Sequence, residues 1–128
     1  MTNNLLTEKK IKYGLETKFI ANKLYYYPEI SSTNKAAAKL ASEGELEGTV
    51  VIAEKQTGGK GRRGREWHSP PGTGLWFSII LKPEIKVAES HFLTINASLA
   101  VFKALQKRGF EIDIKWPNDI LYKNRKVC

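Results

Sequence analysis

The longest run of helical periodicity in the chain lies between Ser90 and Gly109. Its apolar residues are three or four positions apart, which places them on one face of a helix. These residues are Phe92, Ile95, Leu99, Phe102 and Leu105. Lysine and arginine side chains gather near the end of the run, where positive charge suits the helix dipole. The pattern predicts the longest helix of the protein here.

Two shorter helices are predicted in the first half of the chain. The alanine-rich stretch 35–41 follows the polar run 31–34, whose side chains can cap a helix, and Gly44 can end it. Thr7 can cap a short helix that would run through Ile11 and Leu15.

Strands are predicted wherever apolar, aromatic or β-branched residues alternate or cluster between turn residues. In the stretch 75–81 one face is apolar throughout and the other partly so, which indicates a central strand. The other predicted strands are 24–27, 49–53, 110–116, 120–122 and 126–128. Because the sequence stops just after the hairpin turn 123–125, we expect the chain to be a piece of a longer protein.

The composition fits one soluble domain. The chain has 128 residues, 41% of them hydrophobic, which is enough for a modest core. It contains neither a long apolar run nor a secretory signal, so we expect a cytoplasmic protein without membrane association. Cys128 has no second cysteine to pair with, and its spacing from His68 and His91 does not resemble a zinc site.

Positive charge is concentrated in one glycine-rich segment. Residues 55–65 contain five lysines and arginines and no acid, against a net charge of +8 for the whole chain. Four glycines are interspersed among these cations: Gly58, Gly59, Gly61 and Gly64. Glycine lets backbone N–H groups approach a ligand closely, and guanidinium groups pair with phosphate or carboxylate oxygens. The segment therefore predicts a localised anion site.

Two common phosphate-binding motifs do not account for this segment. Its glycines satisfy the spacing of the dinucleotide fingerprint, but that motif needs a helix directly afterwards, and Pro70-Pro71-Gly72 cannot propagate one. A Gly-x-x-x-x-Gly-Lys-Ser/Thr run is also absent from the sequence.

Three motifs together resemble the catalytic domain of the biotin protein ligases, within the biotin/lipoate ligase family. They are Ser32-Thr33-Asn34 at the start of a helix, Gln56 with the following Gly59-Lys60-Gly61-Arg62-Arg63-Gly64-Arg65-x-Trp67, and Lys115-Trp116-Pro117-Asn118-Asp119. The resemblance covers residues 10–128, after a lead of residues 1–9. It implies a mixed α/β fold, with a twisted sheet backed by helices as in class II tRNA synthetases, incomplete at its C-terminal end.

The resemblance also implies a two-step, ATP-dependent ligase. Biotin and ATP form biotinyl-5'-AMP, and a lysine of a biotin carboxyl carrier domain then takes the biotin. Mg²⁺ assists the first step, and homodimers occur in such enzymes. In both steps negative charge develops on phosphate oxygens, and fixed cations and N–H groups stabilise that charge.

Roles implied by the resemblance fall on specific positions. The biotin-binding residues would be Ser32, Thr33, Asn34, Gln56, Lys60, Gly61, Arg62 and Lys126. ATP and adenylate would contact Arg62, Arg63, Arg65, Trp67, Asn118 and Asp119, with Asn118 and Asp119 also holding Mg²⁺. Arg62 and Lys126 would be catalytic. Lys60 departs from the arginine commoner in this family, which keeps the charge but loses the planar fork.

Other interpretations of the same residues stay open. The run from Ser31 to Asn34 can be only a helix cap and Pro117-Asn118-Asp119 only a turn. Lys126 can be a solvated lysine at a hairpin edge, and Trp67 and Trp116 can fill the core. A lipoate or octanoate ligase could share the scaffold, and a non-enzymatic protein could bind nucleic-acid phosphates through the basic segment. Fewer than thirty residues precede the first predicted strand, so we expect no sequence-specific DNA binding from this chain.

Overall fold

The protein, seen in a computed structural model, is described from residue 5 to residue 128. It divides into two compact units, of which the first ends at Lys82 and the second begins at Pro83.

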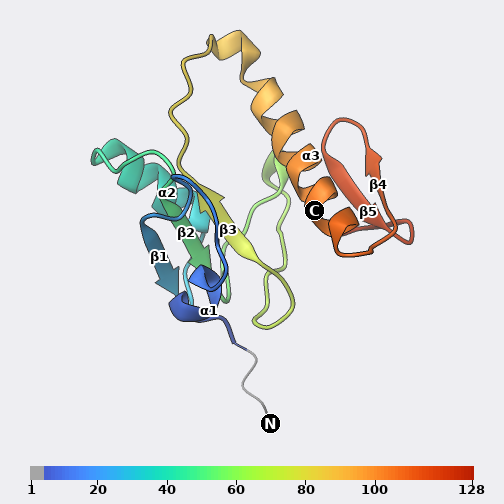
Figure 1. Cartoon of the computed structure of the whole chain (residues 1–128), viewed down its shortest axis with the longest axis horizontal. Coiled ribbons are helices and arrows are strands. Elements are labelled where there is room, and N and C mark those ends of the chain that lie inside the picture. Colours follow the sequence, from blue (N-terminus) through green and yellow to red (C-terminus); the bar gives the residue numbers. More distant parts are fainter. Residues whose placement is uncertain (1–4) are drawn as a thin grey trace. The chain divides into compact units, whose positions relative to one another are not determined.

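The first unit contains a mixed three-stranded sheet and two α-helices (Figure 1). Its strands β1 (Leu24–Tyr27), β2 (Val50–Ala53) and β3 (Trp76–Ile79) lie in that spatial order. β1 pairs with β2 in parallel, and β3 pairs with β2 antiparallel. The helices are α1 (Glu8–Lys12) and α2 (Thr33–Ser42), and a single 3-10 turn, Arg62–Gly64, lies in the basic segment. Mixed pairing with helical cover confirms the expected α/β class.

Local sequence explains where these helices begin and end. Ser32 caps α2, since its hydroxyl accepts a hydrogen bond from the Lys35 amide, and the chain leaves the helix through Gly44 at φ +91°. Thr7 caps α1 in the same way. That helix ends at Lys12, however, and the prediction that it continues to Leu15 is wrong, because Gly14 turns the chain at φ +72°.

The core of the first unit lies between α2 and one face of the sheet. Ala37 of α2 packs with Val51 and Ile80, and half-buried residues of β1 and α2 surround them: Tyr25, Tyr27, Ala36, Leu40 and Ala41. This packing fixes the N-terminal end of α2 against β2 and β3, which positions the first sequence motif.

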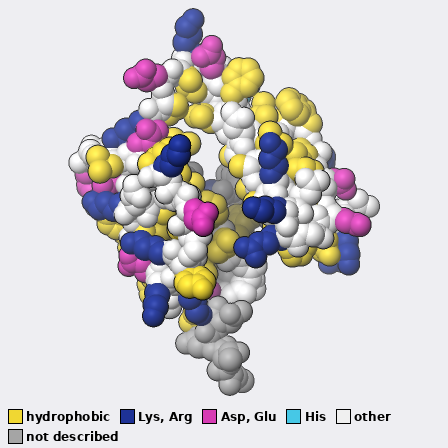
Figure 2. Space-filling model, in the orientation of Figure 1, with side chains coloured by type: hydrophobic (Ala, Val, Ile, Leu, Met, Phe, Trp, Pro, Cys, Tyr) yellow, Lys and Arg dark blue, Asp and Glu magenta, His cyan; other side chains and the backbone are white. Residues whose placement is uncertain are grey.

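The prediction for residues 75–81 was wrong in two respects. β3 is an edge strand and not a central one, because only β2 pairs with it in the described sheet. The alternating apolar residues of this stretch are also on the exposed face, since 61% of the surface of Leu75 and 36% of that of Ile79 is exposed. The other face, which carries Ser78 and Ile80, is turned towards α2. The yellow side chains on the surface in Figure 2 illustrate how much apolar surface the described chain leaves in contact with solvent.

The second unit is one helix against a three-stranded antiparallel sheet (Figure 1). A short 3-10 turn (Val87–Glu89) leads into α3 (His91–Lys107), as the periodicity predicted. The strands β4 (Ile112–Lys115), β5 (Asp119–Tyr122) and β6 (Arg125–Lys126) follow as two hairpins. Ile120 of β5 is fully buried. Neither unit contains, within residues 5–128, a helix long and apolar enough to cross a membrane.

Candidate functional site

The start of α2 carries the first group of predicted site residues. Gln56 accepts two hydrogen bonds from Thr33 through its side-chain Oε1, one from the backbone N at 2.8 Å and one from Oγ1 at 3.1 Å. Ser32 and Thr33 are buried, and Asn34 is exposed at the surface of the helix. At the start of α2, Ser32 therefore caps the helix while the next residue, Thr33, contacts Gln56. Residues 32–34 and Gln56, far apart in sequence, lie together as the motifs predicted.

Two serines that the sequence did not single out complete this cluster. The Ser78 hydroxyl lies 3.0 Å from Thr33 Oγ1 and donates to Asn34 Oδ1 at 3.3 Å. On the other side, Gln56 Nε2 donates to the hydroxyl of the buried Ser69 at 3.2 Å. Ser78 could have been noticed as a hydroxyl inside an apolar strand, and Ser69 as a hydroxyl beside two prolines. We call these six residues the polar wall: Ser32, Thr33, Asn34, Gln56, Ser69 and Ser78.

The hydroxyl groups of the polar wall have more contacts than protons. Thr33 and Ser78 carry one hydroxyl proton each, yet their oxygens take part in three contacts, with Gln56, with Asn34 and with each other. One of the two hydroxyl groups can therefore donate its proton to a ligand while the Thr33 and Ser78 oxygens stay hydrogen-bonded to each other. The wall offers donors and acceptors close together, as recognition of a neutral polar ring requires.

The basic segment folds back on itself as a narrow loop. Trp67 donates its backbone N–H to Gly59 O at 2.9 Å, and Gly61 donates to Arg65 O at 2.7 Å. Between these contacts the chain turns through Arg63 at φ 57° and Gly64 at φ 73°. We call residues 59–67 the basic turn. Its lysine and arginine side chains are exposed: Lys60, Arg62, Arg63 and Arg65.

Gly59 joins the basic turn to the polar wall. A Cβ atom at this position would lie 2.8 Å from Trp67 O, 3.0 Å from Ser69 Oγ and 3.2 Å from Gln56 Nε2. These distances are shorter than ordinary van der Waals contacts. A glycine is therefore required at residue 59 for the turn to start directly beside the Gln56 amide.

A cavity of about 310 Å³ connects the polar wall, the basic turn and β3. Polar residues 32–34, Gln56 and Ser78 line it together with Lys60 and Trp67, and its apolar side consists of Leu75, Trp76 and Phe77. A second hollow of about 300 Å³ lies on the turn side and shares Gln56, Lys60 and Trp67 with the first. The volume of the cavity and its combination of polar and apolar lining residues suit a small organic molecule with one polar end.

The third motif lies in the second unit. Asp119 begins β5 after the turn that contains Asn118, and its Oδ1 lies 2.9 Å from the ammonium Nζ of Lys126 on β6. The three predicted site residues of this unit thus lie on adjacent strands and their turn. The side chains of Asp119 and Lys126 are 29% and 44% exposed, so both remain accessible to a ligand.

The predicted Mg²⁺ ligands provide one carboxylate and one amide oxygen. Within the described residues no group of three or more histidine, cysteine, aspartate or glutamate side chains could hold a metal. A pair such as Asn118 and Asp119 suits Mg²⁺ when phosphate oxygens and water supply the remaining ligands, which is the common arrangement in nucleotide sites. The donor set fits a nucleotide-bound ion.

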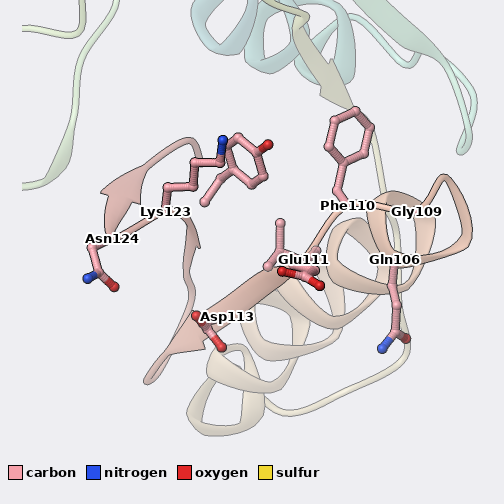
Figure 3. A pocket seen from close by; sticks show the side chains of 9 residues that line it. Gln106, Gly109, Phe110, Glu111, Asp113, Lys123 and Asn124 are labelled. Atoms are coloured by element: carbon pink, nitrogen blue, oxygen red, sulfur yellow. The ribbon is translucent and has the colours of Figure 1, made fainter.

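The second unit also has an open hollow of about 960 Å³ beside β4 and β5 (Figure 3). Lys123 and Asn124 of the hairpin turn lie on one side of it, and Gly109 and Phe110 lie on the other. Its charged groups are of both signs and it contains none of the predicted site residues. The hollow is therefore not part of the candidate site.

Comparison with known proteins places the motifs in a family. The model of the biotin/lipoate A/B protein ligase family matches residues 26–128. The bifunctional ligase/repressor BirA of Bacillus subtilis is 44% identical over 123 residues, which are 95% of this chain and 38% of that protein. The biotin–[acetyl-CoA-carboxylase] ligase of Paracoccus denitrificans is 39% identical over 101 residues, 76% of this chain and 41% of that protein.

A solved structure resembles this fold in the same way. The biotin protein ligase of Aquifex aeolicus in complex with biotin and ATP superimposes with a TM-score of 0.67 and 34% sequence identity, over 83% of this chain and 44% of that one. This chain therefore spans less than half the length of these relatives. Because the family model covers most of its residues, the chain belongs to the biotin/lipoate A/B protein ligase family.

Proposed function

We propose that this chain supplies the biotin- and nucleotide-binding part of a biotin–protein ligase. The observation that carries the proposal is the cavity that the Gln56 side chain, bonded to Thr33 and Ser69, lines together with the apolar Leu75, Trp76 and Phe77. Biotin has a polar ureido ring and an apolar body that match these two sides. The names of the relatives, which include biotin ligases and a complex with biotin and ATP, support the same choice.

In this proposal the polar wall binds the ureido ring and the basic turn receives the carboxylate. Thr33, Ser78 and the Gln56 amide provide the hydrogen bonds, and Trp76 and Phe77 exclude water from the apolar body of biotin. Lys60, the Gly61 backbone and Arg62 meet the negative charge at the other end. Ser32 and Asn34, which line the same cavity, complete the set of residues around the ureido ring.

The proposed first step joins two anions. A biotin carboxylate oxygen attacks the α-phosphorus of ATP, the bond to the β-phosphate breaks, and pyrophosphate leaves. The cations of the basic turn lower the repulsion between the two reactants, with Arg62 on the adenylate and Arg63 and Arg65 towards the pyrophosphate. Trp67 covers the adenylate. In the second unit Asn118 and Asp119 bind the nucleotide and its Mg²⁺, and Lys126 neutralises the carboxylate and α-phosphate oxygens.

The proposed second step transfers biotin to a protein. The ε-amine of a lysine on a biotin carboxyl carrier domain attacks the carbonyl carbon of the mixed anhydride, the bond to AMP breaks, and the amine loses a proton. The product is an amide of biotin, and AMP is released. Exposure of the basic turn leaves room for a carrier surface to approach.

Ligand-dependent stability tests this proposal. A ligand that binds only the folded state raises the midpoint of thermal unfolding. We expect biotin to raise it, biotin with ATP and Mg²⁺ to raise it further, and lipoate with the same nucleotide to have no effect. Lys55→Ala serves as the matched control, because Lys55 pairs with Glu29 outside the cavity and should leave all responses unchanged. A response to lipoate but not biotin would favour lipoate ligation, and a response to nucleic acid alone would contradict both ligase functions.

A further inference from the structure

Glu54 is a buried carboxylate directly after β2. Only 4% of its surface is exposed, yet it carries an ionisable group. Its two oxygens are used separately: Oε1 accepts from the backbone N–H of Gly72 at 2.7 Å, and Oε2 accepts from the backbone N–H of Leu6 at 2.8 Å. A buried carboxylate is tolerated when hydrogen bonds replace its hydration. Glu54 therefore connects two segments that are 66 positions apart in the sequence.

The Gly72 contact holds the loop 69–74 against the residue that follows β2. Gly72 turns this loop at φ +72°, and Trp76 Nε1 donates to Pro70 O at 3.3 Å. At its start, Ser69 O accepts from the backbone N–H of Gln56 at 3.1 Å. The loop is thus attached to the sheet at its beginning, through Trp76 and through Glu54.

The position of this loop fixes one end of the Gln56 amide. Its Oε1 accepts from the Thr33 backbone N–H, and its Nε2 donates to Ser69 Oγ, which itself donates to Trp67 O. A displaced Ser69 would leave Nε2 without its acceptor, so that the amide would be held at the Thr33 end only. Glu54 acts on the polar wall through Gly72 and Ser69, without lining the cavity itself.

The Leu6 contact brings the segment before α1 into the same arrangement. Leu6 precedes Thr7, the cap of α1, and its amide reaches Glu54 across 48 positions of sequence. The neighbouring Leu5 O accepts from Lys10 Nζ at 2.7 Å, which holds the segment against α1. One carboxylate therefore contacts both the N-terminal segment and the loop that orients Gln56.

We propose that Glu54 is a positioning residue for biotin recognition: it holds loop 69–74 so that Ser69 orients Gln56, and it couples the segment before α1 to the polar wall. The inference rests on the proposed function, because it assumes that the polar wall binds biotin. Both oxygens of Glu54 are bonded to backbone N–H groups and Glu54 does not line the cavity, so its loss should weaken biotin binding and leave the rate of the adenylation step at saturating biotin unchanged.

The main test compares Glu54→Gln with Glu29→Gln. Glutamine at 54 puts an NH₂ group against one of the two backbone N–H donors, whereas Glu29 is exposed and pairs with Lys55. We expect roughly tenfold weaker biotin binding by calorimetry for Glu54→Gln, a matching rise in KM for biotin and an unchanged kcat, with no change for Glu29→Gln. Unchanged affinity, or a fall in kcat equal to the rise in KM, would overturn the inference.

A double-mutant cycle separates positioning from general destabilisation. If Glu54 acts through Ser69, then Glu54→Gln combined with Ser69→Ala should bind biotin no more weakly than the weaker single variant. Effects that multiply would show two independent losses and overturn the inference.

A comparison of Leu6→Pro with Leu6→Ala tests the coupling to the N-terminal segment if Glu54→Gln does not fold. Proline removes the N–H donor, and alanine keeps it while also shortening the side chain. We expect severalfold weaker biotin binding for Leu6→Pro only, and equal affinities would overturn the coupling. If the unaltered protein and Glu29→Gln bind no biotin at all, the proposed function fails instead. Protection of the Leu6 and Gly72 amides from hydrogen exchange then still reports whether Glu54 holds both segments.

Discussion

The polar wall and the basic turn are neighbours that are built in opposite ways. In the wall the side chains themselves are fixed, since Thr33 and Ser69 are buried and both hydrogen-bond to the Gln56 side chain. In the turn the backbone is fixed by contacts such as Gly61 to Arg65, and the lysine and arginine side chains are exposed.

The difference reflects what each region would bind. A neutral polar ring gives up its hydration only where donors and acceptors are already in place, because an unpaired buried group is costly. An anion is recognised by charges that stay hydrated until it arrives, and burying four cations together in advance would be unfavourable. A pre-formed wall beside an open cationic turn is thus a reasonable combination for a ligand with a polar ring and a carboxylate.

Removing the centre of the wall should have the largest effect. Gln56→Ala removes the side-chain acceptor of the Thr33 amide and one partner each of the Thr33 and Ser69 hydroxyls. We expect biotin binding to weaken by roughly 10- to 100-fold in calorimetry, as the loss of a buried partner costs about 1–3 kcal/mol. Lys55→Ala is the control. Affinity within twofold of the unaltered protein would mean that the wall is not the biotin site.

Removing a cation from the turn should affect the activated intermediate more than biotin itself. We expect Arg62→Gly to weaken retention of biotinyl-5'-AMP about tenfold, since a hydrogen-bonded ion pair with a phosphate is lost, and to weaken biotin binding less, because Lys60 and the Gly61 backbone still meet the biotin carboxylate. Release of the adenylate, measured by labelling of added bystander lysines, provides the readout. Arg62→Lys, which keeps the charge without the planar fork, should fall in between. Equal leakage from all three proteins contradicts the assignment of Arg62.

Crowding the junction of the two regions should reduce stability. In Gly59→Ala the added methyl group would lie 2.8 Å from Trp67 O, and we expect a loss of about 1–3 kcal/mol in the free energy of unfolding. Gly61→Ala is the matched control, because its Cβ would meet only ordinary contacts of 3.6 Å or more at φ −86°. Urea denaturation measures both. If Gly59→Ala is as stable as Gly61→Ala, the close approach at residue 59 is not required.

The smallest expected effect is on stability and concerns Glu45, which lies near the start of β1, away from the polar wall and the basic turn. Glu45 Oε2 accepts hydrogen bonds from Lys23 Nζ and Tyr25 OH, and these contacts lower the pKa of Glu45 from 4.5 to about 2. A lowered pKa in the folded state stabilises the protein above the unfolded value near 4.5, and the contribution is lost as pH falls from there towards 2.

We therefore expect Glu45→Gln to reduce the free energy of unfolding at pH 7 and to differ less from the unaltered protein at pH 3. Denaturant titrations at both pH values provide the measurement, with biotin affinity at pH 7 as the control that should not change. A difference that grows as the pH is lowered would show that the interaction with Lys23 and Tyr25 is not electrostatic.

Much of the fold followed from local patterns. A cap within residues 31–34, the helix after it and the long helix after Ser90 were all predicted from sequence and found in the structure, where Ser32 is the capping residue. These features depend on backbone hydrogen bonding and on periodicity over a few residues, which neighbouring side chains in the sequence specify. The grouping of 32–34 with Gln56 was also predicted, although through the family resemblance and not through any local rule.

The failures concern burial and non-local contacts. Alternation in 75–81 correctly indicated a strand, but the more apolar face, with Phe77 and Ile79, is the exposed one. Which face of a strand is covered depends on where α2 packs, and α2 packs against Ser78 and Ile80. The participation of Ser69 and Glu54 was not predicted either, because their partners lie 13 to 48 positions away.

The sequence by itself determined the elements, the cationic glycine-rich turn and the family, because each depends on residue type and spacing along the chain. Only the tertiary structure decided that Gln56 would be oriented by Thr33 on one side and Ser69 on the other, and that a buried carboxylate would support that arrangement. The physical reason is that a side-chain hydrogen bond needs two groups within about 3 Å in a suitable direction, and for distant residues that depends on how strands and helices pack.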